Sequence, residues 1–242
     1  MEFTLESSDG KKIHGKLSGE PPKSVVVLLH GMPGSMDDDL FESAEAWFVR
    51  RGYAVCRYNQ YGPDDGSRQL MECDFEVMNA DLANIVEYLR RNNFEQVFLV
   101  GYSFGGLLTL RAARQKVAGA VLWDPSYELS LLNMEGVPRP KYIDSLDAFA
   151  LQCGVNYLVS CKLVEQLEDF PWTKAGLDFS APLKIVIAGR GLLDGAKEYA
   201  LPSAFPRSAV TLEKADHDFG TEVRDELFTE THEWFVRALS SK

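Results

Sequence analysis

The segment that decides the fold runs from Gln96 to Leu108 and reads QVFLVGYSFGGLL. Its apolar beginning, residues 96–100, is typical of a strand buried on both faces of a sheet. A helix is predicted to follow at once, over residues 104–115. The turn between the two, Gly101-x-Ser103-x-Gly105, must be sharp enough to lift the serine hydroxyl clear of the sheet. Side chains at positions 101 and 105 would clash with adjacent backbone of the same protein, so glycine is expected at both.

On both sides of this segment, short β-rich runs alternate with helical patterns. Strands are predicted at 12–17, 25–29, 53–58, 96–100, 119–123, 184–188 and 209–213, and helices at 40–51, 73–91, 104–115, 195–201 and 222–239. The first of these strands alternates polar and apolar residues, as an outer antiparallel strand does. Such alternation predicts an α/β fold whose twisted, mainly parallel sheet carries helices on both faces. Ligands of these sheets bind beyond the carboxyl ends of the strands.

The alternation breaks after Pro125, over residues 126–178. This stretch holds Pro138, Pro140 and Pro171 and no clear strand–helix repeat. We interpret residues 1–242 as one domain and residues 126–178 as a lid or cap insertion within it. Most apolar side chains of the insertion are expected to pack on the core, and a subset could line an apolar site.

Composition excludes several classes of partner. The formal net charge is −11 at pH 7, which disfavours nucleic acids and anionic membranes. No apolar stretch approaches the roughly 20 residues of a membrane span, and no secretory signal is visible.

The four cysteines form no Cys-x-x-Cys pair, so reduced thiols and a cytoplasmic location are expected. We predict no cofactor and no metal, and we interpret Asp37-Asp38-Asp39 as a helix cap.

A serine hydroxyl needs a base to become a good nucleophile, and the chain offers four histidines. His14 lies on the expected outer strand, His30 is expected to hold the loop after a strand, and His232 falls inside the last helix. His217 follows the last strand, at the edge of the sheet where Ser103 is expected. His217 is therefore the predicted base, and Ser103 the predicted nucleophile.

Two aspartates compete to orient the imidazole. Asp194 follows the strand at 184–188, and Asp124 directly follows the strand at 119–123. Either one gives the chain order serine, acid, histidine, and we favour Asp194. Asp216 and Asp218 adjoin His217 and are interpreted as turn or capping residues.

Acyl transfer also needs hydrogen-bond donors for the oxyanion that develops. The backbone N–H of Phe104 is next to the nucleophile and begins a helix. A second donor is expected from the loop at 30–34, where Pro33 has no N–H and Met32 is the natural candidate. The alternative for this loop is a plain Gly/Pro turn.

These features together resemble the α/β-hydrolase superfamily. The resemblance rests on His30-Gly31 after a buried strand, Gly-x-Ser103-x-Gly, a late Asp and Asp216-His217, and it covers nearly the whole chain except the insertion. Residues 58–62 and the helix from Cys73 are similar to bacterial carboxylesterases of the feruloyl/cinnamoyl esterase and acylaminoacyl-peptidase-like group. The resemblance implies a catalytic triad, an oxyanion hole built from the amides of Met32 and Phe104, and a lid at 126–178.

Two positions depart from the family pattern. Family members usually place the acid three residues after the strand-ending glycine, but position 192 is Leu and Asp194 comes two residues later. That departure keeps Asp124 open as the acid. Tyr102 stands where histidine is frequent, at a position that need not take part in chemistry.

The resemblance favours a serine esterase acting on small-molecule carboxylic esters with small to medium acyl or aryl groups. A thioesterase, an amidase or an acyltransferase would use the same constellation. The competing class is a non-catalytic ligand-binding protein of the same fold, since fold alone does not fix function. A homodimer is left open.

Overall fold

The central sheet of the computed structural model has eight strands in the described part of the chain. That part comprises residues 1–19, 23–112, 116–134, 137–153, 155–172, 174–175, 177, 179–191 and 207–240. The strand order is β1-β2-β4-β3-β5-β6-β10-β11. The strands are β1 (Glu2–Glu6), β2 (Lys12–Ser18), β3 (Ser24–Leu29), β4 (Ala54–Tyr58), β5 (Gln96–Tyr102), β6 (Gly119–Trp123), β10 (Leu183–Ala188) and β11 (Arg207–Leu212). β1 and β2 are antiparallel to their neighbours and the others run parallel, which confirms the predicted α/β sheet.

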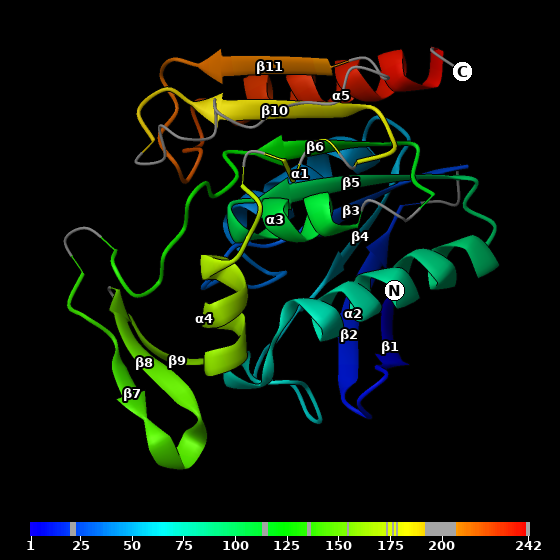
Figure 1. Cartoon of the computed structure of the whole chain (residues 1–242). Helices are drawn as coiled ribbons and strands as arrows, with labels where there is room; N and C mark the ends of the chain where they lie inside the picture. The colour runs from blue at the N-terminus through cyan, green and yellow to red at the C-terminus, as the bar shows by residue number, and fades with distance from the viewer. Residues whose placement is uncertain are drawn as a thin grey trace.

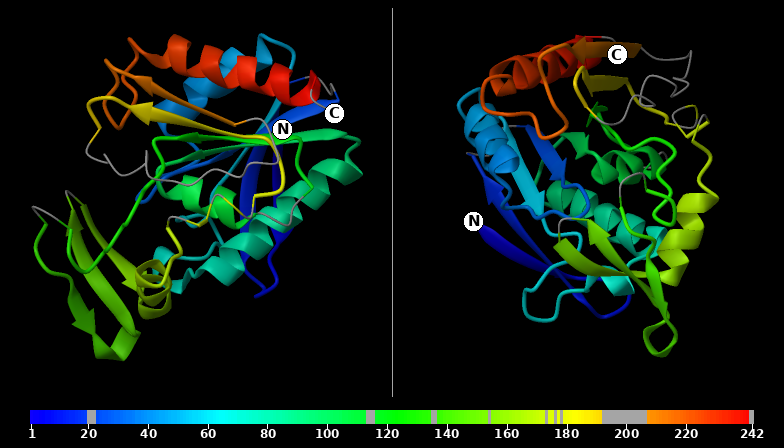
Figure 2. Two further views of the ribbon diagram at one scale, coloured as in Figure 1. Left: turned by 45° about the horizontal axis from the view of Figure 1, so that its top comes forward. Right: turned by 90° about the vertical axis from the view of Figure 1, so that its left-hand side faces the viewer.

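Helices cover both faces of this sheet (Figure 2). The helices are α1 (Asp39–Val49) and α5 (Arg224–Ser240) on one face, and α2 (Phe75–Arg91) and α3 (Phe104–Arg111) on the other. β3 shows why its sequence is apolar throughout. Val25 and Val27 pack into the core beneath α2 and α3, whereas Val26 and Leu28 pack toward α1 and α5. Alternate side chains of a central strand therefore bury themselves in two separate cores.

Residues 126–178, the predicted insertion, contain a small antiparallel sheet. Its strands are β7 (Lys141–Ile143), β8 (Ala148–Cys153) and β9 (Val155–Ser160), and α4 (Cys161–Glu168) follows. The sheet projects beyond the main body on the side to which the arrows of β6, β10 and β11 point (Figure 1). Lys162 at the start of α4 pairs with Asp74, the N-cap of α2, at 2.7 Å. The insertion is thus anchored to the body near the carboxyl edge of the sheet.

The helix predicted over 195–201 lies outside the described residues. Within the described ranges, no helix is both long enough and apolar enough to cross a membrane.

Candidate active site

Ser103 sits in a tight turn between β5 and α3. Its backbone adopts φ 51° and ψ −118°, a left-handed conformation that is costly for a residue with a side chain and is typical of functional sites. A Cβ on Gly105 would lie 2.6 Å from the carbonyl oxygen of His30, and a Cβ on Gly101 would lie 2.7 Å from the carbonyl carbon of Gly105. Side chains at these two positions are therefore excluded by backbone, and the turn depends on both glycines.

His217 lies beside Ser103, in the loop between β11 and α5. Its Nε2 is 3.1 Å from Ser103 Oγ. The ring of Tyr102 packs against the imidazole with the two centroids 5.1 Å apart, and the Tyr102 hydroxyl donates to Asp218 at 3.3 Å. Tyr102 thus connects the turn that carries the serine to the loop that carries the histidine.

Asp124 completes a hydrogen-bonded chain of three side chains. It directly follows β6 and is fully buried. Its Oδ2 lies 2.6 Å from His217 Nδ1, and its Oδ1 accepts a hydrogen bond from the Ala188 N–H at 3.0 Å. Both carboxylate oxygens are therefore occupied, and one of them holds the imidazole with Nε2 toward Ser103.

Strand order explains how Asp124 reaches the histidine. β6 lies between β5 and β10, and Tyr102 pairs with Trp123 in register, so Ser103 and Asp124 leave adjacent strands at the same level. Asp124 has φ 39°, and its N–H donates to Val186 of β10 at 2.7 Å. Asp194, the acid favoured from the sequence, lies outside the described residues. The carboxylate that is hydrogen-bonded to Nδ1 of His217 is that of Asp124, the alternative acid.

The loop after β3 runs alongside the nucleophile. A Cβ on Gly31 would lie 3.2 Å from Ser103 Cβ, so the next residue, Met32, is also close to the turn. Phe104 is the first residue of α3, where backbone N–H groups have no partner within the helix. The two amides predicted to form the oxyanion hole therefore belong to segments that border Ser103, and their role remains a prediction.

The other three histidines have different surroundings. His14 contacts Thr4 and the backbone oxygen of Asp65, and His232 contacts the Tyr53 hydroxyl. His30 is buried, and its Nε2 accepts a hydrogen bond from the N–H of Gln60 at 3.1 Å. Desolvation by burial lowers the pKa of His30 to about 4. His30 is therefore a neutral residue built into the loop.

The depressed pKa of His30 predicts a pH-dependent stability. Between about pH 6.5 and pH 4 the unfolded state binds a proton at His30 that the folded state does not, so stability falls as pH is lowered. His30→Asn should reduce the slope of unfolding free energy against pH in this range by about 1.4 kcal/mol per pH unit. Urea denaturation at several pH values measures it, with His14→Asn as the control, and an unchanged slope in His30→Asn would contradict the assignment.

Two residues near the site were not predicted from the sequence. Ser126 is buried, and its Oγ lies 3.4 Å from Ser103 Oγ. Tyr61 contacts the loop that contains Met32. Both come three residues after the end of a strand, at the carboxyl edge of the sheet, and that position is the signal that could have identified them.

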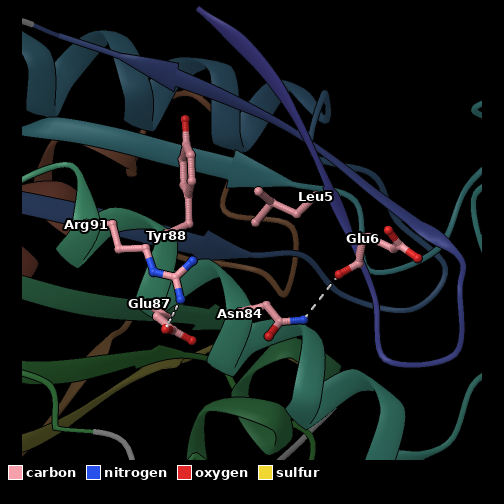
Figure 3. Close-up of a pocket in the computed structure, with 6 residues that line it drawn as sticks. All are labelled: Leu5, Glu6, Asn84, Glu87, Tyr88 and Arg91. Carbon is pink, nitrogen blue, oxygen red and sulfur yellow. Dashed lines mark hydrogen bonds and ion pairs between the residues drawn. The ribbon is translucent and has the colours of Figure 1, made fainter.

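No cluster of three or more His, Cys, Asp or Glu side chains within the described ranges could hold a metal. A pocket of about 260 Å³ lies between β1 and α2 (Figure 3). There Arg91 pairs with Glu87, and Asn84 donates to the backbone oxygen of Glu6 at 3.5 Å. The residues that line this pocket include no serine, cysteine or histidine, so it offers no pair of nucleophile and base.

The comparisons with known proteins bear on the fold and the family of the chain. The family described as the alpha/beta hydrolase fold matches residues 24–158. Est1E from Butyrivibrio proteoclasticus, solved with ferulic acid, is similar with a TM-score of 0.78 at 16% identity, over 98% of this chain and 99% of that one. The esterase EaEST from Exiguobacterium antarcticum gives 0.71 at 14% identity, over 97% and 99% of the two chains. Mouse alpha/beta hydrolase domain-containing protein 10 gives 0.76 at 15%, over 98% and 99%. At these identities the structures show a shared fold, and with the family match they establish that the chain belongs to the α/β hydrolase fold family.

Proposed function

We propose that this protein is a serine hydrolase that cleaves carboxylic esters of small to medium acyl or aryl groups through an acyl-enzyme intermediate. The observation that carries the proposal is the continuous chain from Ser103 Oγ to His217 Nε2 at 3.1 Å and from His217 Nδ1 to Asp124 Oδ2 at 2.6 Å. A hydroxyl becomes an effective nucleophile when a base accepts its proton and a third group orients that base.

In the acylation step, Ser103 Oγ attacks the ester carbonyl carbon while His217 Nε2 accepts the hydroxyl proton. Asp124 holds the Nδ1–H of the imidazole and stabilises the imidazolium that forms. Negative charge develops on the former carbonyl oxygen, and the amides of Phe104 and Met32 donate hydrogen bonds to it. The carbon–oxygen bond to the leaving group then breaks, and His217 gives its proton to the departing alcohol.

In the second step, water attacks the acyl group on Ser103, and His217 accepts a proton from that water. Collapse of the second tetrahedral intermediate breaks the bond to Ser103 Oγ, which recovers its proton from His217. The products are a carboxylic acid and the original enzyme, so the cycle needs no group beyond water and the chain's own residues.

Aromatic side chains of the insertion support an acyl or aryl substrate. Tyr127 follows Ser126, whose Oγ contacts Ser103 Oγ, and its ring lies 6.0 Å from that of Trp172. The ring of Trp172 in turn lies 4.6 Å from that of Phe170. We propose that these rings form an apolar wall of the substrate site, because small-molecule sites are usually lined by apolar groups with a few polar ones. We propose that the insertion at 126–178 forms the lid of this site.

Turnover of nitrophenyl esters of increasing acyl length tests the proposed activity. We expect hydrolysis that saturates with substrate and prefers short to medium or aromatic acyl groups over long chains. A Ser103→Ala preparation purified in the same way is the blank for contaminating esterases. Acyl-thioesters of the same lengths should be poorer substrates. Faster turnover of thioesters would reassign the substrate class, and turnover of neither class would contradict the proposal.

A further inference from the structure

The hydroxyl of Tyr61 bridges two backbone groups of the loop after β3. Tyr61 comes three residues after the end of β4. Its hydroxyl donates to the carbonyl oxygen of Gly31 at 3.1 Å and accepts a hydrogen bond from the N–H of Gly34 at 3.2 Å. Burial raises the pKa of Tyr61, so the hydroxyl keeps the proton that it donates. One hydroxyl thus fixes the loop on both sides of Met32.

The carbonyl of Gly31 has a second partner in His30. The Nε2 of His30 accepts from the N–H of Gln60, which leaves the proton of the neutral ring on Nδ1. That Nδ1 lies 2.9 Å from the Gly31 carbonyl oxygen. The oxygen therefore accepts from Tyr61 and from His30, and both of its lone pairs are used.

The Gly31 carbonyl and the Met32 N–H belong to the same peptide group. This group is planar and trans, so the N–H points away from the carbonyl, and fixing one end fixes the direction of the other. Hydrogen bonds to the carbonyl also polarise the group and strengthen its N–H as a donor. The loop needs such support, because Gly31 and Gly34 flank Met32-Pro33 and glycine restrains the backbone least.

We propose that Tyr61 is a positioning residue for the oxyanion hole, acting through the Gly31–Met32 peptide. The inference rests on the proposed function, since it requires that the Met32 amide stabilises an oxyanion on the substrate of Ser103. Tyr61 itself touches neither the nucleophile nor the reacting carbonyl in this scheme. Its hydroxyl holds the Met32 N–H in the direction that the transition state needs, before the substrate arrives.

Tyr61→Phe removes this hydroxyl and keeps the ring. We expect kcat for a nitrophenyl ester to fall by about 10- to 100-fold with KM nearly unchanged, less than the 10²–10³ lost with an oxyanion donor itself. Tyr58→Phe is the matched control, because its buried hydroxyl has no hydrogen-bond partner among the described residues. The pH profile of kcat/KM should keep its midpoint in Tyr61→Phe, since the hydrogen bonds among the three triad side chains are untouched.

A thionoester, in which sulfur replaces the carbonyl oxygen, separates this role from a structural one. Sulfur is a weak hydrogen-bond acceptor, so its turnover depends little on the oxyanion hole. The ratio of kcat/KM for ester over thionoester should therefore fall about tenfold or more in Tyr61→Phe and stay at the wild-type value in Tyr58→Phe. Equal losses on both substrates would overturn the inference, and so would wild-type kinetics in Tyr61→Phe.

Ser103→Ala tests the proposed function separately from the role of Tyr61. If Ser103→Ala keeps the wild-type activity, the proposed function fails and the inference fails with it. If Ser103→Ala is inactive but the ester/thionoester ratio of Tyr61→Phe is unchanged, the inference alone fails.

Discussion

Replacing His217 by alanine is expected to lower kcat for a nitrophenyl ester by about 10⁶-fold. Without Nε2 at 3.1 Å from Ser103 Oγ, the hydroxyl has no group to accept its proton as it attacks. The residual rate should come from binding and from the oxyanion hole alone. KM should change little, because His217 acts in the transition state.

The double variant of Ser103 and His217 tests whether the two residues act as one unit. Ser103→Ala should lose as much activity as His217→Ala, and the double variant should lose no more than either, because nucleophile and base act as one unit. His14→Ala is the control, since His14 lies on β2 and its imidazole contacts only Thr4 of β1 and the backbone oxygen of Asp65, in the loop after β4, among the described hydrogen bonds. Losses that add in the double variant, or a His217→Ala enzyme with more than a percent of wild-type activity, would contradict the assigned base.

Asp124→Asn is expected to lower kcat by about 10⁴-fold. The Ala188 N–H needs an acceptor, so the amide oxygen should turn toward it and the NH₂ toward His217 Nδ1. The imidazole would then accept at Nδ1 and carry its proton on Nε2, the tautomer that cannot take the proton of Ser103. The loss thus comes from a wrong tautomer in an almost unchanged site.

Asp194→Asn is the informative comparison for Asp124→Asn, because the sequence favours Asp194. If Asp124 is the acid, Asp194→Asn leaves the serine, the base and the group that orients the base in place, so kcat should change by less than about threefold. Thermal unfolding of both variants checks that they are folded. A large loss in Asp194→Asn together with a small one in Asp124→Asn would return the role to Asp194.

The sequence was sufficient for most of the sheet. Strands buried on both faces, such as β3 and β5, are apolar throughout and easily found. β1 was missed because it is a short edge strand in which only Phe3 and Leu5 are partly buried. The small sheet of the insertion was also missed, since β7 is mostly exposed and β9 begins with two exposed residues, so neither strand carries a strong pattern.

For the candidate site, local motifs predicted Ser103 and His217, and tertiary structure was needed to see which carboxylate lies on His217 Nδ1. Asp124 and Asp194 both follow strands, and the sequence alone does not show which carboxylate lies close to His217 Nδ1. The contact of Asp124 depends on β6 lying next to β5 and on a positive φ at Asp124, and no local sequence pattern predicts either. The contacts of Tyr61 with Gly31 and Gly34 likewise join segments about 30 residues apart.

Mass spectrometry of the native protein after brief treatment with a fluorophosphonate tests the central claim most directly, namely that Ser103 is a nucleophile activated by His217 and Asp124. We predict one adduct per chain, located on the peptide that contains Ser103, absent in Ser103→Ala and strongly slowed in His217→Ala and Asp124→Asn. No adduct under native conditions, an adduct on a different residue, or labelling of Ser103 at the same rate in all these folded variants would contradict it.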